Sequence, residues 1–303
     1  WLDRIMAGRV PQMGRVALSP MLSPKGRLIG DFTISCLGEE EFQLTASYGS
    51  QAFHFRWFHK HKEDGVTIEN ISDKRNGFQI AGPNASKVLQ ACTGADISAI
   101  RFLDVMKMTV GMTDCIVQRI SYTGDLGFEI YCDPMGQRQL WDTLWTAGAA
   151  HGMVPFGMRA MMSLRLDKFF GSWLSEYSPD YSAAETGLDR FICWSKNTDF
   201  IGRSASQAER KKGPKRKLVA LEVDADEADV QGYEPIWLDG VVVGFCTSGG
   251  YSHYSSKSVA IGFLPTIHIA EGRTVEIEIL GQMRPARVIT TPLFDPDGTA
   301  LRV

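Results

Sequence analysis

Residues 116–131 read Ile-Val-Gln-Arg-Ile-Ser-Tyr-Thr-Gly-Asp-Leu-Gly-Phe-Glu-Ile-Tyr and predict a β-hairpin. The first arm is rich in β-branched and aromatic residues, and the centre carries two glycines that adopt positive φ at low cost. Side chains alternate in the second arm, so Glu129 and Tyr131 share one face of the strand. A carboxylate in an otherwise apolar strand has two explanations. Either its face is solvated or paired with an arginine, or it receives a polar ligand in a cleft.

The bulk composition excludes several classes of protein. A chain of 303 residues is long enough for two or three domains with separate cores, and 44% hydrophobic residues with 22% charged residues exclude general disorder. A net charge of −3 gives no general attraction to nucleic acid or to an anionic membrane. No apolar run approaches the ~20 residues of a membrane span, and no signal-peptide pattern opens the chain. We therefore expect a protein of the cytoplasm or the mitochondrial matrix that is not secreted.

The start of the chain and its cysteines give two further expectations. The sequence opens on Trp1 without a methionine, in a segment that reads like the end of a helix, so we expect a fragment of a longer chain. None of the six cysteines forms a Cys-x-x-Cys pair, and all lie among apolar neighbours. They are expected as buried free thiols in a reducing compartment, with neither a disulfide framework nor a metal site.

The first part of the chain predicts strands and a helix around an unusual aspartate. We expect strands at 14–18, 27–34 and 42–45, a turn at 23–26, and a helix over 50–62 with Ser50 as its N-cap. Asp31 lies in the middle of the second strand, where aspartate is disfavoured, and Gly30 leaves space beside it. Asp31 has two explanations. It lies at a bulge or in an edge strand and has no functional role, or it belongs to a functional site.

A second unit begins near residue 65. The pattern predicts strands at 66–70, 77–82 and 106–110, helices at 83–94 and 136–150, and the hairpin described above. This order indicates an α+β sandwich of ferredoxin-like type over residues 65–150. Residues 1–64 and 151–209 are expected to form a split α+β domain.

The remaining segments predict a helix, a linker and a barrel. A helix over 155–170 carries Arg159 and Arg165, which leave it in different directions. One of them is expected to point into a cleft while the other pairs with Asp167 or Glu185. The basic stretch 209–217 has no interleaved aromatics and is interpreted as an interdomain linker rather than a nucleic-acid patch. Short strands from 218 onward predict a small β-barrel or jelly-roll-like domain over 210–303.

Five blocks carry a family resemblance over nearly the whole chain. They are Met21–Asp31, Ser121–Ile130, Pro155–Arg159 with Ser163–Leu166, Glu185–Phe191 with Asp199–Arg203, and Thr247–Ser252 with Lys257. In this order they resemble the folate-binding aminomethyltransferase (glycine-cleavage T protein) family. Leu-Ile-Gly-Asp-Phe-Thr and Gly-Leu-Asp-Arg-Phe look most like the C-terminal folate domain of dimethylglycine and sarcosine dehydrogenases, since T proteins usually have two adjacent acids where this chain has Gly30 and Asp31.

The resemblance implies a fold, a cofactor and roles for individual residues. The family fold is three domains in a ring around a central channel for tetrahydrofolate. Glu129 would bind the pterin edge with Tyr122 lining the same pocket, and Arg159, with Arg165 as the fallback, would meet the folate's glutamate carboxylate. Asp31 would be the catalytic residue at the reactive end, where it orients the amine, takes its proton or steadies a cationic iminium.

In the dehydrogenase branch, an upstream flavin domain that carries FAD oxidises a small methylated amine to an iminium. The folate domain then captures the one-carbon unit as 5,10-methylenetetrahydrofolate. No dinucleotide-binding glycine motif occurs in this sequence, so FAD is expected only on an upstream domain. Two alternatives stay open: a free-standing aminomethyl- or methyltransferase served by a lipoyl carrier protein or a methyl donor, and a folate-binding module without catalysis.

Overall fold

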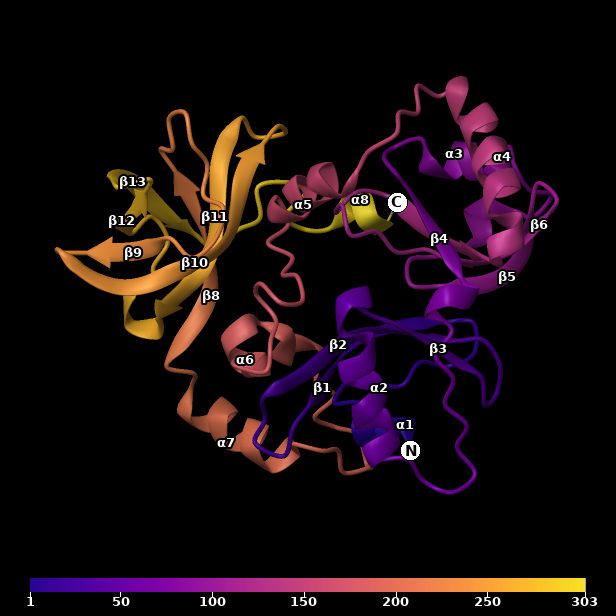
Figure 1. The fold of residues 1–303 in the computed structure, drawn as a ribbon, viewed down its shortest axis with the longest axis horizontal. Helices are drawn as coiled ribbons and strands as arrows, with labels where there is room; N and C mark the ends of the chain where they lie inside the picture. The colour runs from indigo at the N-terminus through magenta and orange to yellow at the C-terminus, as the bar shows by residue number, and fades with distance from the viewer. Residues whose placement is uncertain (303) are drawn as a thin grey trace.

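The computed structural model describes residues 1–302. Its first sheet is an antiparallel hairpin extended by one strand. Its unit contains α1 (Leu2–Ile5), β1 (Val16–Leu22), β2 (Leu28–Cys36), β3 (Phe42–Thr45) and α2 (Gln51–Lys60) (Figure 1). The predicted turn at 23–26 joins β1 to β2, and Gly26 adopts a φ of +75° there, which glycine tolerates without a steric cost. The sequence therefore predicted this part of the fold correctly.

The strand β2 separates a packed face from a polar face. Phe32 and Ile34 are buried against Phe58 of α2. Since successive side chains of a strand point to opposite faces, Asp31 lies on the face away from α2. Ser50 occupies the predicted N-cap position of α2, although its side chain makes no capping hydrogen bond. Aromatic packing, rather than the cap, holds α2 on the sheet.

The strand predicted at residues 66–70 is wrong. These residues run without regular secondary structure and have no partner strand among the described residues. The apolar alternation of Val66 and Ile68 is real, but a strand exists only where a neighbour completes its hydrogen-bond ladder. Ile68 instead packs against the core beneath α2.

The second unit is a four-stranded antiparallel sheet with two helices on one face. Its elements are β4 (Asn76–Ala81), α3 (Ala85–Gln90), β5 (Val105–Val110), β6 (Thr113–Gln118), β7 (Gly127–Cys132) and α4 (Gln137–Ala149), in the sheet order β4-β7-β6-β5. Phe128 and Ile130 of β7 are fully buried with Leu140 of α4. Glu129 therefore lies on the opposite face of the sheet, away from the helices.

A mostly irregular stretch with short helices leads from the second unit to the barrel. It contains α5 (Met158–Leu166), α6 (Ala183–Thr186) and α7 (Arg203–Lys212). The helix predicted over 155–170 is thus shorter at both ends. The predicted linker 209–217 is also only partly correct, since the last turn of α7 and the start of the next strand cover most of it.

The C-terminal unit is a closed barrel. Its strands are β8 (Arg216–Val223), β9 (Pro235–Leu238), β10 (Val241–Ser252), β11 (Lys257–Pro265), β12 (Thr274–Ile279) and β13 (Gln282–Ile289), in the order β10-β11-β8-β13-β12-β9, and α8 (Thr299–Arg302) follows. Closure leaves no free sheet edge and buries a core that includes Leu221, Ile236 and Ile277. The predicted barrel is confirmed, with β9 as the strand that the sequence pattern missed.

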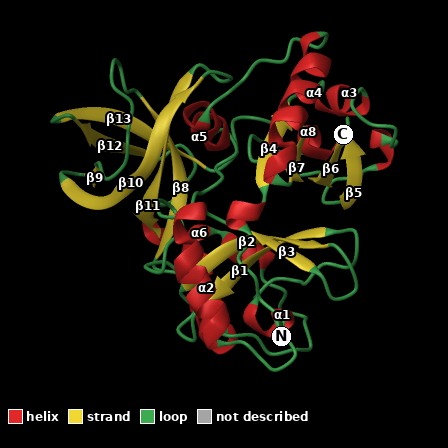
Figure 2. Cartoon of the chain, turned by 45° about the vertical axis from the view of Figure 1, so that its right-hand side comes forward, coloured by secondary structure: helices red, strands yellow, loops and turns green. Residues whose placement is uncertain are grey.

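The three units surround a common centre. Figure 1 shows the barrel, the β4–β7 sheet and the β1–β3 sheet on three sides, with α5 between the barrel and the β4–β7 sheet. In Figure 2, α6 lies between the barrel and the β1–β3 sheet. This arrangement matches the expected three-part α+β ring. All six cysteines are free thiols, and Cys193 alone among them is partly exposed. Within residues 1–302, no helix has the length and apolar character needed to cross a membrane.

Candidate functional site

Asp31 presents a half-buried carboxyl group on β2. Burial raises the pKa of Asp31 to about 6, and a hydrogen bond from its own backbone amide opposes this shift. No side chain among residues 1–302 donates a hydrogen bond to its carboxylate. Such a group changes its protonation state near neutral pH, as a proton-transfer group requires.

Two tyrosines from different parts of the chain lie close to Asp31. The Tyr122 hydroxyl donates a 2.6 Å hydrogen bond to the carbonyl of Gly171, and the Gly171 amide donates a 3.1 Å bond to the Tyr177 hydroxyl. Burial raises the pKa of Tyr122 to about 12 and the pKa of Tyr177 still further, and the nearby charge of Asp31 adds to both shifts. Both phenols therefore stay protonated at neutral pH and serve as polar walls of the site.

Glu129 is held from its own strand. The Tyr131 hydroxyl donates a 2.6 Å hydrogen bond to Oε2 of Glu129, whereas Oε1 has no hydrogen-bond partner among residues 1–302. Burial raises the pKa of Glu129, and the bond from Tyr131 opposes that rise. In the ladders, Gln79 and Gln118 lie directly opposite Glu129 on the two flanking strands. A row of three polar side chains thus crosses the face of the sheet; we call Gln79, Glu129 and Gln118 the Glu129 row.

The Glu129 row faces the surface that carries Asp31. The Thr45 side chain forms a hydrogen bond with the Tyr131 hydroxyl. Thr45 lies opposite Thr33 in the β2–β3 ladder, and Thr33 follows Asp31 by two residues on the same face of β2. The two carboxylates predicted from the sequence therefore lie on facing surfaces of two different sheets.

The two predicted arginines on α5 have different environments. Arg159 is exposed near the start of the helix. Arg165 is only 1% exposed and forms a 2.7 Å ion pair with Glu176. The expected partners Asp167 and Glu185 are wrong: Glu185 pairs with Arg27 and Arg216 instead. Because its guanidinium is committed to Glu176, Arg165 is a poorer candidate than Arg159 for a ligand carboxylate.

Glu176 joins the site to the barrel. It accepts hydrogen bonds from Arg165, from the backbone amide of Ser172, and from the hydroxyls of Thr247 and Ser248 on β10. These four donors offset the cost of burying the Glu176 carboxylate. Without them, a buried charge in that position would destabilise the fold. The segment 171–176 that holds Tyr122 is therefore anchored to α5 and to the barrel at once.

Sequence reasoning missed Glu176, Tyr177, Gln79 and Gln118. The first two lie in a stretch without periodicity, so no local pattern could reveal them. The two glutamines were detectable only through the register of three strands, which depends on how the sheet assembles. Tyr131 had a local signal, since alternation places it on the face of Glu129.

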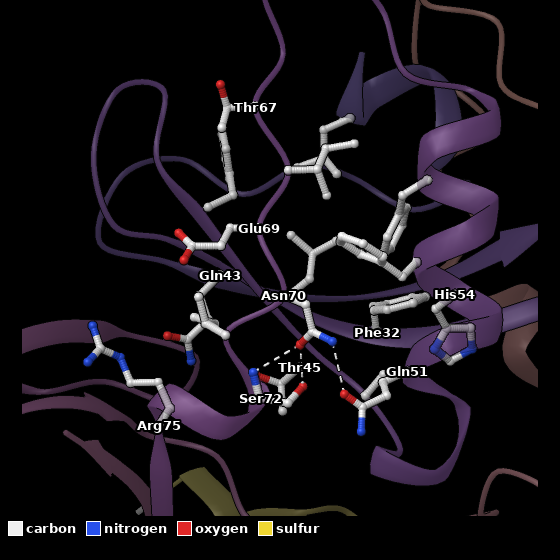
Figure 3. A pocket seen from close by; sticks show the side chains of 18 of the residues that line it. Phe32, Gln43, Thr45, Gln51, His54, Thr67, Glu69, Asn70, Ser72 and Arg75 are labelled. Atoms are coloured by element: carbon white, nitrogen blue, oxygen red, sulfur yellow. Dashed lines mark hydrogen bonds between the residues drawn. The ribbon is translucent and has the colours of Figure 1, made fainter. Parts of the chain in front are cut away.

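A cavity lies beside these residues, not among them. It has a volume of about 880 Å³ and runs between β3, α2 and the irregular segment 65–72. Figure 3 shows Phe32 and His54 on one side of it and Glu69, Gln43 and Arg75 on the other.

The cavity does not include Asp31, Glu129, Tyr122 or Arg159. Its contact with the site is Tyr131, whose hydroxyl bonds Glu129. Phe32 lines the cavity from the face of β2 opposite to Asp31, whereas Gln43 and Thr45 of the edge strand β3 line it from the Asp31 face. No group of three or more metal-ligating acidic, histidine or cysteine side chains occurs within the described residues.

Comparison with known proteins identifies the family. The profile of the GCVT N-terminal domain matches residues 1–196, and that of the glycine cleavage T-protein C-terminal barrel domain matches residues 216–295. The chain belongs to the glycine cleavage T-protein family. The second match coincides with the closed barrel of β8–β13, and the first covers both sheets and the segment that holds Tyr177.

Relatives of this family member include two kinds of enzyme. The chain is 38% identical to mitochondrial dimethylglycine dehydrogenase of Homo sapiens over all of its own length, but it spans only 36% of that protein. It is 30% identical to an aminomethyltransferase of Geobacillus sp. (strain WCH70), covering 97% of this chain and 81% of that protein. The crystal structure of glycine cleavage system aminomethyltransferase T from Bartonella henselae matches 97% of this chain and 81% of its own with a TM-score of 0.86, which at 23% identity shows a common fold.

Proposed function

We propose that this chain binds tetrahydrofolate between its sheets and captures a one-carbon unit from an iminium derived from a methylated amine. The observation that supports this most is the pair of half-buried carboxylates, Asp31 and Glu129, which lie on facing surfaces of two sheets and whose pKa values desolvation raises. Buried carboxylates without compensating cations are costly and are retained where a ligand or a reaction uses them. Bound tetrahydrofolate would supply two secondary amine nitrogens that receive the carbon as 5,10-methylenetetrahydrofolate.

Glu129 is suited to hold the pterin edge. That edge offers adjacent N–H donors, and a carboxylate accepts two of them in a bidentate arrangement. With Oε2 already oriented by Tyr131 and Oε1 unpartnered, the carboxylate is aligned before a ligand arrives. Restricting the rotamer in advance lowers the entropic cost of binding.

Asp31 would then handle charge and protons at the reactive end. As a carboxylate it stabilises a cationic iminium, and as a base it accepts the proton that the attacking amine releases. A pKa of about 6 leaves it mostly ionised at pH 7 yet able to return the proton to the departing amine. Atoms and charge balance in this reaction: an iminium and tetrahydrofolate give the protonated secondary amine and 5,10-methylenetetrahydrofolate.

Tyr122 and Arg159 complete the proposed binding site. Tyr122 lies between Asp31 and the segment anchored by Glu176 and forms an aromatic wall. Arg159, exposed on α5, would meet the glutamate carboxylate of folate at the mouth of the site, where a planar guanidinium pairs well with a carboxylate. Arg165 serves the scaffold in this assignment.

We assign the methylated amine and the flavin chemistry to a longer protein of the dimethylglycine dehydrogenase type. In it, a flavin domain before this chain would oxidise the amine to the iminium, and the protein would work in the mitochondrial matrix or the cytoplasm. The Geobacillus aminomethyltransferase, of which this chain covers 81%, supports a second candidate. There, a lipoyl carrier protein would deliver the aminomethyl group.

Titration of the purified chain with tetrahydrofolate tests the proposal. We expect saturable binding that Glu129→Ala abolishes and Asp31→Asn preserves. Formation of methylenetetrahydrofolate from formaldehyde-derived iminium of dimethylamine should fall at least ~100-fold in Asp31→Asn. Full activity in Asp31→Asn would favour a binding module without a catalytic role for Asp31, and absence of any binding to the wild-type chain would refute the proposal.

A further inference from the structure

Gln118 is an internal amide with no internal partner. Its side chain is 0% exposed, and neither its Oε1 nor its Nε2 has a hydrogen-bond partner among residues 1–302. It lies directly opposite Glu129 in the β6–β7 ladder and opposite Val105 in the β5–β6 ladder. Cross-strand neighbours have Cβ atoms about 4.5–5.5 Å apart. The orphaned amide is thus the immediate neighbour of the proposed pterin ligand Glu129.

Stability does not account for an amide at this position. A buried amide whose donor and acceptor are both unpaired costs free energy, and an apolar residue of similar shape avoids that cost. The same strand face carries Ile116, two residues earlier, which is buried in an apolar cluster with Val16 and Val105. A leucine would suit those surroundings better. The amide therefore has a donor and an acceptor that no described residue uses.

Its neighbours in the row already have partners. Gln79, on the other side of Glu129, donates a 3.5 Å hydrogen bond to the Ser121 hydroxyl, and Ser121 in turn bonds Thr123. Glu129 has one oxygen engaged by Tyr131. Within residues 1–302, the row's unmatched groups are Oε1 of Gln79, Oε1 of Glu129 and both polar atoms of Gln118, and only Gln118 lacks a partner altogether.

We infer that Gln118 is a second recognition residue for the pterin ring and selects its reduced form. This inference rests on the proposed binding of tetrahydrofolate. Next to the two N–H groups that a carboxylate accepts, a tetrahydropterin presents an acceptor, N1, and a donor, N8–H. A carboxamide matches that pair with its NH2 and its carbonyl oxygen. In fully oxidised folic acid N8 carries no hydrogen and faces the carbonyl as a second acceptor, so Gln118 rejects the oxidised ring.

The discriminating variant is Gln118→Leu, measured by calorimetric titration with tetrahydrofolate and with folic acid. We expect the affinity for tetrahydrofolate to fall by about tenfold, as loss of a paired donor and acceptor does. The affinity for folic acid should change less than about twofold, because the bond that its N1 accepts from the amide is offset by the acceptor N8 facing the amide carbonyl. The ligand-free variant should melt at the same temperature as the wild type or higher.

Thr113→Val is the matched control. Thr113 begins the same strand, and its buried hydroxyl also lacks a partner among the described residues, but it lies away from the Glu129 row. This variant should reproduce the change in melting temperature and leave both affinities unchanged.

The possible results separate the inference from the proposed function. Selective loss of tetrahydrofolate affinity in Gln118→Leu supports the inference. Wild-type affinity in that variant, or an equal loss for both ligands, overturns it and leaves folate binding intact. A wild-type chain that binds neither ligand overturns the proposed function, and the role of Gln118 falls with it.

Discussion

The hydroxyl of Tyr131 lies 2.6 Å from Oε2 of Glu129, two residues away on the same face of β7, and it donates its proton to that oxygen. The bond opposes the rise in the Glu129 pKa that burial causes. It also connects the β7 carboxylate to the first sheet, because Thr45 bonds the same hydroxyl. A short strand segment thereby supplies both the carboxylate that we propose for ligand binding and the donor that opposes the rise in its pKa.

Replacing Tyr131 with phenylalanine tests this relationship. Without the donor, the Glu129 pKa should rise further, and less carboxylate will be present at neutral pH. We expect tetrahydrofolate affinity to fall by about five- to tenfold at the lower of two pH values and to recover toward the wild-type value at the higher one. Titration at the two pH values measures this, with Tyr48→Phe, an exposed tyrosine, as the control. A loss that is independent of pH would show that the hydroxyl acts on something other than Glu129 ionisation.

Asp31→Asn should stabilise the ligand-free chain. The folded-state pKa of about 6 lies above the ordinary aspartate value of 3.8, so the folded state binds the proton more tightly. The stability that protonated Asp31 contributes is present in full below the unfolded-state pKa of 3.8. It is lost as the pH rises through the folded-state pKa of about 6. At pH 8 the asparagine variant should therefore gain up to about 3 kcal/mol of unfolding free energy, and less at pH 5. Urea unfolding at both pH values measures this gain, and a gain of equal size at both would contradict the burial of an ionised Asp31.

The sequence predicts this site in part, and the limit is physical. Asp31 and Glu129 stand out because each is a charge within a strand, and strand alternation tells which face each occupies. Gln118 does not stand out, since a glutamine at the end of β6 is ordinary until the register places it opposite Glu129. Glu176 is invisible for a different reason: its four donors come from α5, a loop and β10, which only the tertiary fold brings together.

The same limit explains the errors in the fold. Val66 and Ile68 alternate as in a strand, but no neighbouring strand pairs with them within residues 1–302. The sequence pattern shows which side chains are apolar, but whether a segment pairs as a strand depends on a partner strand from another part of the chain. Elements with many local signals, such as the turn at Gly26 and the β12–β13 hairpin, were predictable because turn chemistry acts within a few residues.

Arg159→Ala should separate recognition of the folate tail from recognition of the ring. If Arg159 meets the glutamate carboxylate, the variant should bind tetrahydrofolate about tenfold more weakly. Its affinity for a tetrahydropterin without the aminobenzoyl-glutamate tail should equal that of the wild type. Arg138→Ala, which removes an exposed arginine of α4, is the control for a simple change in net charge. Equal weakening of both ligands would assign Arg159 a role other than binding the tail.

The buried pair Arg165–Glu176 should dominate the stability of the segment that carries the site. Arg165→Met leaves the Glu176 carboxylate fully buried without its cation, so we expect a loss of about 3–5 kcal/mol in unfolding free energy. The double variant Arg165→Met, Glu176→Gln should recover part of that loss, since a neutral amide keeps hydrogen bonds to Thr247 and Ser248 without a buried charge.

Arg138→Ala breaks an ion pair of similar length, 2.9 Å, between side chains that are 87% and 57% exposed. Solvent screens that pair, so the expected change is below about 1 kcal/mol. Denaturant unfolding of the wild type, Arg165→Met, Glu176→Gln, the double variant and Arg138→Ala tests the contrast. A double variant that is as unstable as the sum of the two single replacements would mean that Arg165 and Glu176 act independently. In that case the anchoring of Tyr122 through Gly171 would need another explanation than the ion pair.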